Sequence, residues 1–130
     1  MRLSFLDESM VGAVINQLDI ETQAPVLSVR EIIELRVRAE VDRFNQQREQ
    51  SYFNGLIAPV DAEKTLNGYL LKPNQKIDAE KQYYIAVDAF QKNGFFMLIN
   101  DKQVDDLNET FTLTPYTKIS FVKITPLVGG

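Results

Sequence analysis

The residues best suited to chemistry are the last two, Gly129 and Gly130. A terminal carboxylate is a poor acyl donor until it is adenylated, after which a thiol or an amine can attack its carbonyl carbon. To be adenylated, the carboxylate must reach the α-phosphate of ATP inside a partner enzyme. Glycine has no Cβ and accepts any φ, so two glycines give a slim leader. We therefore predict that Gly130 is the activated residue and Gly129 its slim neighbour.

Chance is a weak explanation for this pair. Glycine makes up about 7% of average usage, so two glycines at one given place arise by chance in about 0.5% of sequences. The other explanation without functional meaning is that the glycine pair was introduced by cloning. The pair also follows closely on an apolar, strand-like run that Pro126 ends. Both position and composition favour a functional tail over residues 126–130, which we expect to be flexible.

The chain contains no cysteine and no histidine, which excludes several kinds of catalytic and metal-binding site. It can form no disulfide, thiolate nucleophile, Cys/His zinc site or histidine base. Serine, threonine and carboxylates are present, but no constellation with a base stands out. We expect no catalytic residue, no metal site and no cofactor of its own, so any thiol must come from a partner.

Length and charge narrow the class of protein. The chain has 130 residues, 45% of them hydrophobic, and we expect a single domain over 1–130. Its net charge of -4 argues against a nucleic-acid partner and suits docking onto a basic patch of a protein. It has no apolar signal core and no run long enough to span a bilayer, so we expect a cytoplasmic protein without a membrane partner.

The first third of the chain predicts two strands and a helix. Residues 2–6 alternate up to a turn-prone stretch at 7–9, and residues 13–20 alternate again, which is typical of an antiparallel pair. Ser28 and Glu31 then form a capping box, and apolar residues follow it at helical spacing. Arginines and acids interleave along the helix, which predicts a solvated face with i,i+4 ion pairs rather than a phosphate or RNA track. The apolar positions are Val29, Ile33, Val37, Val41 and Phe44.

The middle of the chain is harder to interpret. Residues 50–77 are irregular, with two Asn-Gly turns, and short strands or a helical turn are expected there. A second helix is predicted after Asp78, which caps it, and Asn93-Gly94 ends it. We treat the segment of about 50–93 as an insertion that carries this second helix.

The last third predicts strands. Residues 95–99 form a continuous apolar run, typical of a strand covered on both sides or nearly so, and 102–104 form a short strand after a turn. Residues 117–125 alternate. In this last strand Ile119 and Phe121 are predicted on one face, and Val122 and Ile124 on the other.

Residues 95–130 resemble the last three strands of ubiquitin-like proteins. Lys102-Gln103 after its turn resembles the Lys-Gln of ubiquitin, and the closing Pro-Leu-Val-Gly-Gly resembles the small subunit of molybdopterin synthase. The N-terminal hairpin and capped helix fit the opening β-β-α of the same fold. The chain is therefore similar to the prokaryotic ubiquitin-like and sulfur-carrier β-grasp family. This resemblance implies an α+β fold, a mixed sheet packed by a long helix, with the inserted second helix as a departure.

The resemblance also implies roles for named residues. Gly130 would be adenylated and then enter a thioester or isopeptide bond. Leu127, Val128 and Gly129 would be gripped by the activating enzyme, which uses ATP and magnesium. Val122 and Ile124 fall where ubiquitin shows an outward apolar patch; the alternative is that the inserted helix covers them. Further partners would be a conjugating enzyme and a deconjugating peptidase.

Three functions remain open from the sequence. The first is a protein modifier of a bacterial conjugation system, passed to a target amine. The second is a sulfur carrier whose Gly130 becomes a thiocarboxylate. The third is a β-grasp scaffold that is never conjugated and binds a partner through its sheet. The extra helix favours the first or third, because dedicated sulfur carriers tend to be minimal, and the Gly-Gly end disfavours the third.

Overall fold

The computed structural model of the chain describes residues 1–47, 52–60, 62–72 and 75–124. Its class is α+β, with two helices and a five-stranded mixed sheet, as predicted at that level. The elements in chain order are β1 (Arg2–Glu8), β2 (Val14–Glu21), β3 (Val26–Ser28), α1 (Val29–Gln46), β4 (Tyr52–Phe53), β5 (Glu63–Thr65), β6 (Gly68–Leu70), α2 (Ala79–Gln91), β7 (Phe95–Ile99), β8 (Lys102–Val104), β9 (Thr110–Thr112) and β10 (Ile119–Lys123).

The chain divides into two compact units. Unit 1 comprises Met1–Ile32 and Ala89–Gly130, and unit 2 comprises Ile33–Asp88. Both helices contribute to both units, since α1 and α2 each contain a boundary between them. Unit 2 holds most of the segment predicted as an insertion.

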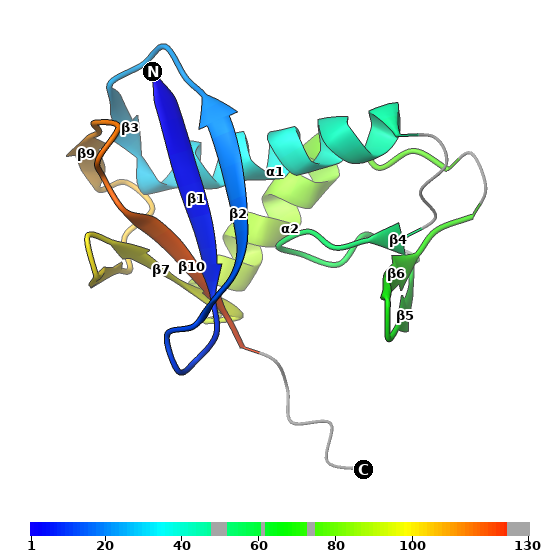
Figure 1. Cartoon of the computed structure of the whole chain (residues 1–130). Coiled ribbons are helices and arrows are strands. Elements are labelled where there is room, and N and C mark those ends of the chain that lie inside the picture. Colours follow the sequence, from blue (N-terminus) through cyan, green and yellow to red (C-terminus); the bar gives the residue numbers. More distant parts are fainter. Residues whose placement is uncertain (48–51, 61, 73–74, 125–130) are drawn as a thin grey trace. The chain divides into compact units, whose positions relative to one another are not determined.

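Unit 1 is organised around the five-stranded sheet, whose strand order is β2-β1-β10-β7-β8 (Figure 1). The central strands β1 and β10 run parallel, and each of the other neighbouring pairs is antiparallel. Phe5 pairs with Ile119 across the central ladder. The first and last strands of the described chain therefore form the middle of the sheet.

The predicted N-terminal hairpin is confirmed, but β1 continues to Glu8 instead of stopping at the turn-prone residues 7–9. Asp7 pairs with Phe121 and Glu8 with Val122, so β10 extends the ladder past the expected end. Asp7 and Glu8 remain in the strand, despite their preference for turns, because the parallel strand β10 pairs with them.

The predicted turn between β7 and β8 is also confirmed. Asn100 and Asp101 both have positive φ, 51° and 66°. Two-residue hairpin loops need positive φ at both positions, which asparagine and aspartate tolerate better than most residues. Ile99 and Lys102 flank the loop as a paired position.

Aromatic rings hold the buried face of this sheet to the last turn of α2. Phe5 and Phe121 lie 5.7 Å apart, edge to face, and Phe121 lies 6.1 Å from Phe95. Phe90 of α2 continues the series at 5.9 Å from Phe95. Such pairs contribute about 0.5–1.5 kcal/mol each beyond area burial. Ile119 and Phe121, which were predicted to share a face of the strand, are both buried.

A small antiparallel sheet of β3 and β9, which the sequence did not indicate, supports the start of α1. Just beyond β3, the amides of Val29 and Arg30 donate to the carbonyls of Glu109 and Leu107, at 2.9 and 3.0 Å. These amides belong to the first turn, which has no partners within the helix. No turn or alternation in the sequence marked these two strands of three residues each.

The predicted capping box of α1 is present in both directions. The Glu31 amide donates to Oγ of Ser28, and the Ser28 amide donates to Oε1 of Glu31, each at 3.1 Å. The predicted apolar stripe is buried at all five positions. Local chemistry alone was sufficient to locate this helix.

One prediction for α1 is wrong. Arg36 was expected on a solvated face, but it is 1% exposed and pairs with Glu40. Glu40 also accepts the amide of Leu56 at 2.8 Å, so a segment distant in sequence covers the pair. The expected exposed pairing holds for Arg38, whose Nε lies 2.9 Å from Glu34.

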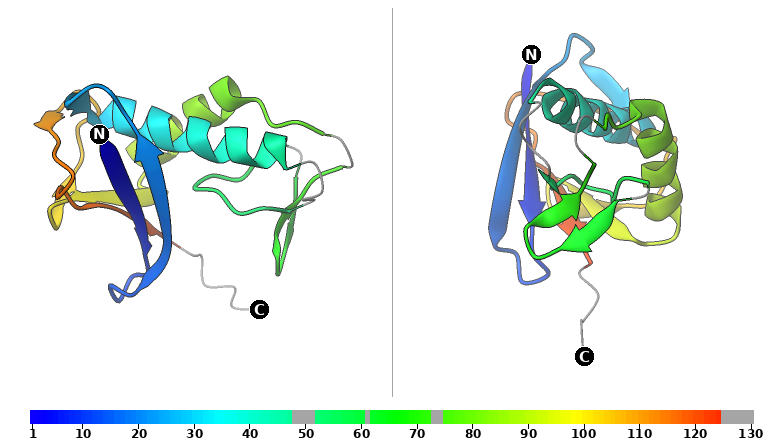
Figure 2. Two further views of the ribbon diagram at one scale, coloured as in Figure 1. Left: turned by 45° about the horizontal axis from the view of Figure 1, so that its top comes forward. Right: turned by 90° about the vertical axis from the view of Figure 1, so that its right-hand side faces the viewer.

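Unit 2 contains a second small sheet, with strand order β4-β6-β5, in the segment expected to be irregular (Figure 2). Gly68 begins β6 with a φ of 120°, which few other residues adopt. Nδ2 of Asn54 donates to the carbonyl of Asn67 at 3.1 Å. The two Asn-Gly turns of the sequence are therefore bonded to each other.

Helix α2 begins and ends where predicted. Oδ1 of Asp78 accepts the amide of Lys81 at 3.1 Å, and Asn93 has a φ of 59° beyond the last turn. The Gly94 amide donates to the carbonyl of Ala89 at 2.7 Å, closing the C-terminus. Within the described ranges, no helix is long and apolar enough to cross a membrane.

Candidate functional site

The predicted tail, Leu127, Val128, Gly129 and Gly130, lies outside the described residues. The structure does describe the point from which the tail departs. Ile124 follows the end of β10, a central strand of the sheet. The candidate site is therefore the edge of the sheet at which β10 ends, together with the face beside it.

Three elements meet at this edge. Because β1 and β10 are parallel, Glu8 and Val122 lie opposite each other near the ends of their strands (Figure 1). The β1–β2 hairpin loop begins at the same edge. On the other side of β10, β7 starts here, with Phe95 opposite Lys123.

Val122 belongs to an apolar stripe on the face opposite the Phe5–Phe121 core. Residues directly opposite in a ladder point to the same side, and Val122 lies opposite Phe96. Ser120 lies opposite Leu98 on one side and Leu6 on the other. We call Leu6, Phe96, Leu98 and Val122 the outer-face stripe. All four are half-buried.

Sequence reasoning found Val122 on this face and missed the other three members of the stripe. The run 95–99 is apolar throughout, so its composition could not show which residues face which side. The expectation that this strand is covered on both sides holds in part, since Phe95, Met97 and Ile99 are buried and the two between them half-buried. Ile124, beyond the end of the strand, is 39% exposed.

The hairpin tip adds the most exposed apolar group of unit 1. Met10, Val11, Val14 and Ile15 are 66%, 90%, 57% and 62% exposed. The pairing shifts by one residue between Asp7 and Glu8, which leaves Ile15 as the extra residue of a β-bulge. Exposing four large apolar side chains within six positions to water is unfavourable, and none of them contributes to a core. They therefore indicate a contact surface.

A polar cluster that contains the buried side chains of Ser120 and Glu8 lies beside the outer-face stripe. Oγ of Ser120 donates to Oε1 of Glu8 at 3.0 Å, and Nζ of Lys118 lies 3.3 Å from the same oxygen. Nζ of Lys118 also donates to Oδ1 of Asp101 at 2.8 Å. The bonds to Asp101 and Glu8 raise the pKa of Lys118 above its usual 10.5. The cluster ties β1, β10 and the β7–β8 turn together.

A second buried acid lies at the same edge. Asp7 is 3% exposed, its Oδ2 lies 3.9 Å from Nζ of Lys123, and Nδ2 of Asn16 donates to that oxygen at 3.5 Å. Buried carboxylates need such partners because desolvation is costly. Both acids are therefore paired: Asp7 with Lys123, the last residue of β10, and Glu8 with Lys118, which precedes the first residue of that strand.

This arrangement is suited to binding and presentation. Within the residues that the structure describes, no group of three or more carboxylates, histidines or cysteines could hold a metal ion. The buried acids Asp7 and Glu8 are held by ion pairs and hydrogen bonds. What the site offers is an apolar face and an apolar tip, both at the edge where the chain leaves the sheet.

Comparisons with protein-family models, with curated proteins and with solved structures find no match for this chain. Its function must therefore be inferred from its own residues and their arrangement.

Proposed function

We propose that this chain is a ubiquitin-like protein modifier of the β-grasp type, whose Gly130 carboxylate is adenylated and then transferred to a target amine. Its strand order supports the proposal. A hairpin, a capped helix, and a last strand inserted parallel to the first at the sheet centre are the features expected of a β-grasp. Fold alone does not establish function, so the tail carries most of the weight.

The observation that carries the proposal is the distance along the chain between the sheet and the glycine pair. Seven residues, 124 to 130, follow the end of β10 at Lys123. Fully extended, seven residues span at most about 25 Å. That reach is enough to place a carboxylate deep inside a partner while the folded body remains outside. Two glycines at its end are the residues that a narrow channel admits most easily.

The proposed reaction has three steps, all in partner enzymes. A carboxylate oxygen of Gly130 attacks the α-phosphate of ATP, and pyrophosphate leaves. A partner thiolate attacks the acyl carbon, AMP leaves, and a thioester forms. A target amine then displaces the thiolate, losing a proton, to give an isopeptide bond. The chain is the acyl donor in each step and needs no catalytic residue of its own.

The outer-face stripe and the hairpin tip supply the recognition surface in this scheme. Both lie beside the edge from which the tail departs, so an enzyme holding the tail can contact them at the same time. Ile124 joins the stripe to the tail. The Asp7–Lys123 pair ties the last residue of β10 to β1.

A sulfur carrier shares the adenylation step, and the acceptor separates the two functions. Sulfide would attack the acyl carbon of the adenylate, AMP would leave, and the chain would carry a thiocarboxylate but be otherwise unchanged. A partner persulfide would first give an acyl disulfide, which a second partner thiol would reduce to the thiocarboxylate as the two partner sulfurs form a disulfide. The additional unit 2 favours the modifier, because it offers surface for successive partners that a minimal shuttle does not need. Both functions require a free carboxylate at Gly130, whether the encoded chain ends there or is cut there.

The first test is ATP–pyrophosphate exchange with a candidate adenylating enzyme from the same genome. We expect exchange with the wild-type chain and its loss when Gly130 is deleted or Gly129 is replaced by tryptophan. Tyr116→Ala, at an exposed residue outside the outer-face stripe and the hairpin tip, serves as the control and should leave exchange unchanged. Full exchange by the tail variants would refute activation at Gly130.

The second test separates modifier from carrier. Tagged protein is recovered from its host and analysed by denaturing gel and intact mass, which also determines the mature C-terminus. Thiol-resistant adducts of higher mass that require Gly130 support conjugation. A single unconjugated chain with the oxygen-to-sulfur mass shift would support the carrier instead.

A further inference from the structure

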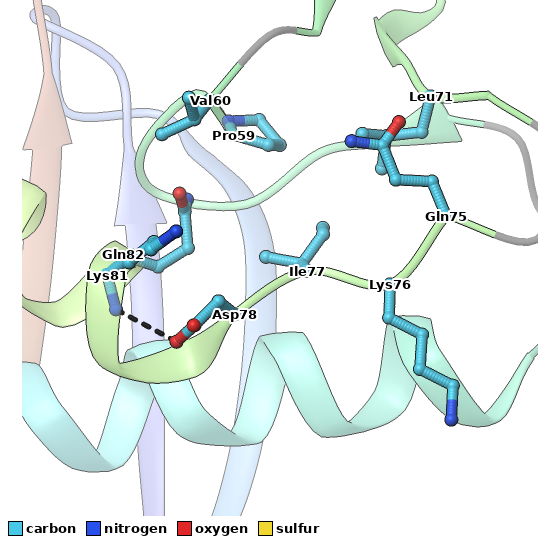
Figure 3. A pocket seen from close by; sticks show the side chains of 9 residues that line it. All are labelled: Pro59, Val60, Leu71, Gln75, Lys76, Ile77, Asp78, Lys81 and Gln82. Atoms are coloured by element: carbon cyan, nitrogen blue, oxygen red, sulfur yellow. Dashed lines mark hydrogen bonds between the residues drawn. The ribbon is translucent and has the colours of Figure 1, made fainter.

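Unit 2 contains a small pocket that the proposed function does not use. It has a volume of about 160 Å³ and lies between the segment at Pro59 and Val60 and the segment leading from Gln75 into α2 (Figure 3). Apolar side chains of Pro59, Val60, Leu71 and Ile77 line it, and Lys76 and Lys81 border it. All of these residues belong to unit 2, so the pocket lies within one compact unit.

The volume limits what can bind. Pockets for drug-sized ligands and cofactors measure about 300–1,000 Å³, and this pocket is smaller. An apolar cavity of about 150 Å³ holds one benzene molecule. The pocket therefore matches a single phenylalanine- or leucine-sized side chain, which is the size of an anchor residue in a protein interface.

Side-chain hydrogen bonds to backbone groups fix both walls of the pocket. Asn45 of α1 bonds to the backbone of Ile77 twice: its Nδ2 donates to the carbonyl, and its Oδ1 accepts the amide, both at 3.0 Å. On the opposite wall, Nε2 of the buried Gln82 donates to the carbonyls of Ile57 and Ala58, at 3.3 and 3.4 Å. These bonds prevent the walls from collapsing into the space between them.

The buried Arg36–Glu40 pair fixes the start of the same wall. Oε2 of Glu40 accepts the amide of Leu56 at 2.8 Å, three residues before Pro59. Pre-formed binding sites cost less conformational entropy on binding than flexible ones. Three separate polar contacts thus hold two irregular segments around a space that apolar and polar side chains line together, which a loop needing only to connect β4 and β5 does not require.

Charge at the rim indicates the chemistry of the partner. The lining contains two lysines and one aspartate, a net charge of +1, on a chain whose net charge is -4. Asp78 is already engaged, because its Oδ1 accepts the amide of Lys81 as the cap of α2. Lys76 and Lys81 are exposed and available to an anionic group.

We propose that this pocket docks a short acidic protein segment that inserts one phenylalanine- or leucine-sized side chain between Val60 and Ile77. Glutamates or aspartates flanking the anchor would pair with Lys76 and Lys81. The pocket is independent of the tail, so this binding goes beyond the proposed function and is tested without any activating enzyme.

The probes are four capped pentapeptides, titrated into the full-length, isotope-labelled protein and followed by NMR. Glu-Glu-Phe-Glu-Glu should bind with a Kd of about 1 mM or tighter and shift the amides of Val60, Ile77 and Gln82. Replacing the anchor by alanine should weaken binding about 10- to 100-fold. Replacing the glutamates by lysine should weaken it about 3- to 10-fold at low salt, and the leucine version should bind like the parent.

Two matched pairs of variants test the location. Val60→Glu should abolish binding of the phenylalanine peptide, whereas Leu66→Glu, at a fully exposed apolar residue of the same unit, should not. The double charge reversal Lys76→Glu with Lys81→Glu should weaken binding, whereas Lys64→Glu should leave it unchanged. Leu66 and Lys64 lie on the β5–β6 hairpin and do not line the pocket.

Three outcomes would overturn the proposal: no shift at 5 mM peptide, equal binding of the phenylalanine and alanine peptides, or unchanged binding by Val60→Glu. Free phenylacetate is the remaining probe. If it binds at the pocket while the peptides do not, the site is one for small carboxylates and the peptide proposal is wrong.

Discussion

Oγ of Ser120 donates a 3.0 Å hydrogen bond to Oε1 of Glu8, joining the two parallel central strands through buried side chains. Ser120→Ala should lower the free energy of unfolding by about 1–2 kcal/mol, because it removes a partner from a buried charged group. Urea denaturation measures the change. Ser9→Ala, which removes an exposed hydroxyl contact, should cost under about 0.5 kcal/mol. Equal effects of the two variants would contradict this role for Ser120.

The raised pKa of Lys118 predicts that the stability of the folded protein depends on pH in the alkaline range. Its pKa in the folded protein is raised, first by Asp101 and then by Glu8, above the value of 10.5 expected in the unfolded chain. Its contribution to stability is therefore complete below about pH 10.5 and is lost as the pH rises through the folded pKa. Lys118→Arg stays charged throughout, so its unfolding midpoint should exceed that of wild type increasingly above that pH. A constant difference between pH 9 and 12 would count against the argument.

The contribution of the α1 capping box to the free energy of unfolding can be measured without changing the buried apolar residues of the helix. Ser28→Ala removes the acceptor of the Glu31 amide and should cost about 1 kcal/mol in thermal or urea unfolding. Ser28→Asp keeps an acceptor at the helix N-terminus and should remain within about 0.5 kcal/mol of wild type. If the aspartate variant is as unstable as the alanine variant, the cap does not explain the effect.

Gly68 and Gly12 form a matched pair of glycines with positive φ, 120° and 85°. A Cβ on Gly68 would lie 2.3 Å from Oδ1 of Asn54, whereas one on Gly12 meets nothing within 4 Å. Gly12→Ala should therefore cost about 1 kcal/mol from backbone strain alone, and Gly68→Ala about 2–3 kcal/mol. Adding Asn54→Ala to Gly68→Ala should recover part of the loss, and its failure to do so would exclude the steric cause.

The buried Arg36–Glu40 pair should show strong coupling. Arg36→Met leaves the Glu40 carboxylate without its cation and should cost about 3–5 kcal/mol. Glu40→Gln should also destabilise, since Arg36 then loses its counter-charge. The double variant should cost less than the sum of the two, and a double-mutant cycle by urea denaturation measures the difference. Additive losses would mean that the two residues act independently.

Local signals predicted those parts of the fold that depend on local chemistry. Both helices begin at their predicted caps, Ser28 and Asp78, and the predicted turn at Asn100-Asp101 is present, with positive φ at both residues. Capping and turn preferences act over three or four residues, so a single sequence contains all the information they need.

The features that were not predicted from the sequence depend on contacts between residues far apart in the chain. Arg36 is buried because of Leu56, and β1 passes its predicted end because β10 lies beside it. For the candidate site, the sequence identified Val122 but not Leu98 or Phe96, since strand register decides which residues of an apolar run share a face. The tail was predicted from its composition and from its position after a strand-like run, and its residues lie outside those that the structure describes.

The pairing of Phe5 with Ile119 joins positions 114 residues apart, so the sheet closes only when almost the entire chain has left the ribosome. Without β10, the β1–β2 and β7–β8 hairpins share no strand and leave unpaired edges of the kind that aggregate or attract proteases. A product that ends before β10 lacks the strand that joins the two hairpins, and we expect it to be unable to close this sheet. Folding of the sheet thus requires synthesis at least to Lys123, the last residue of β10.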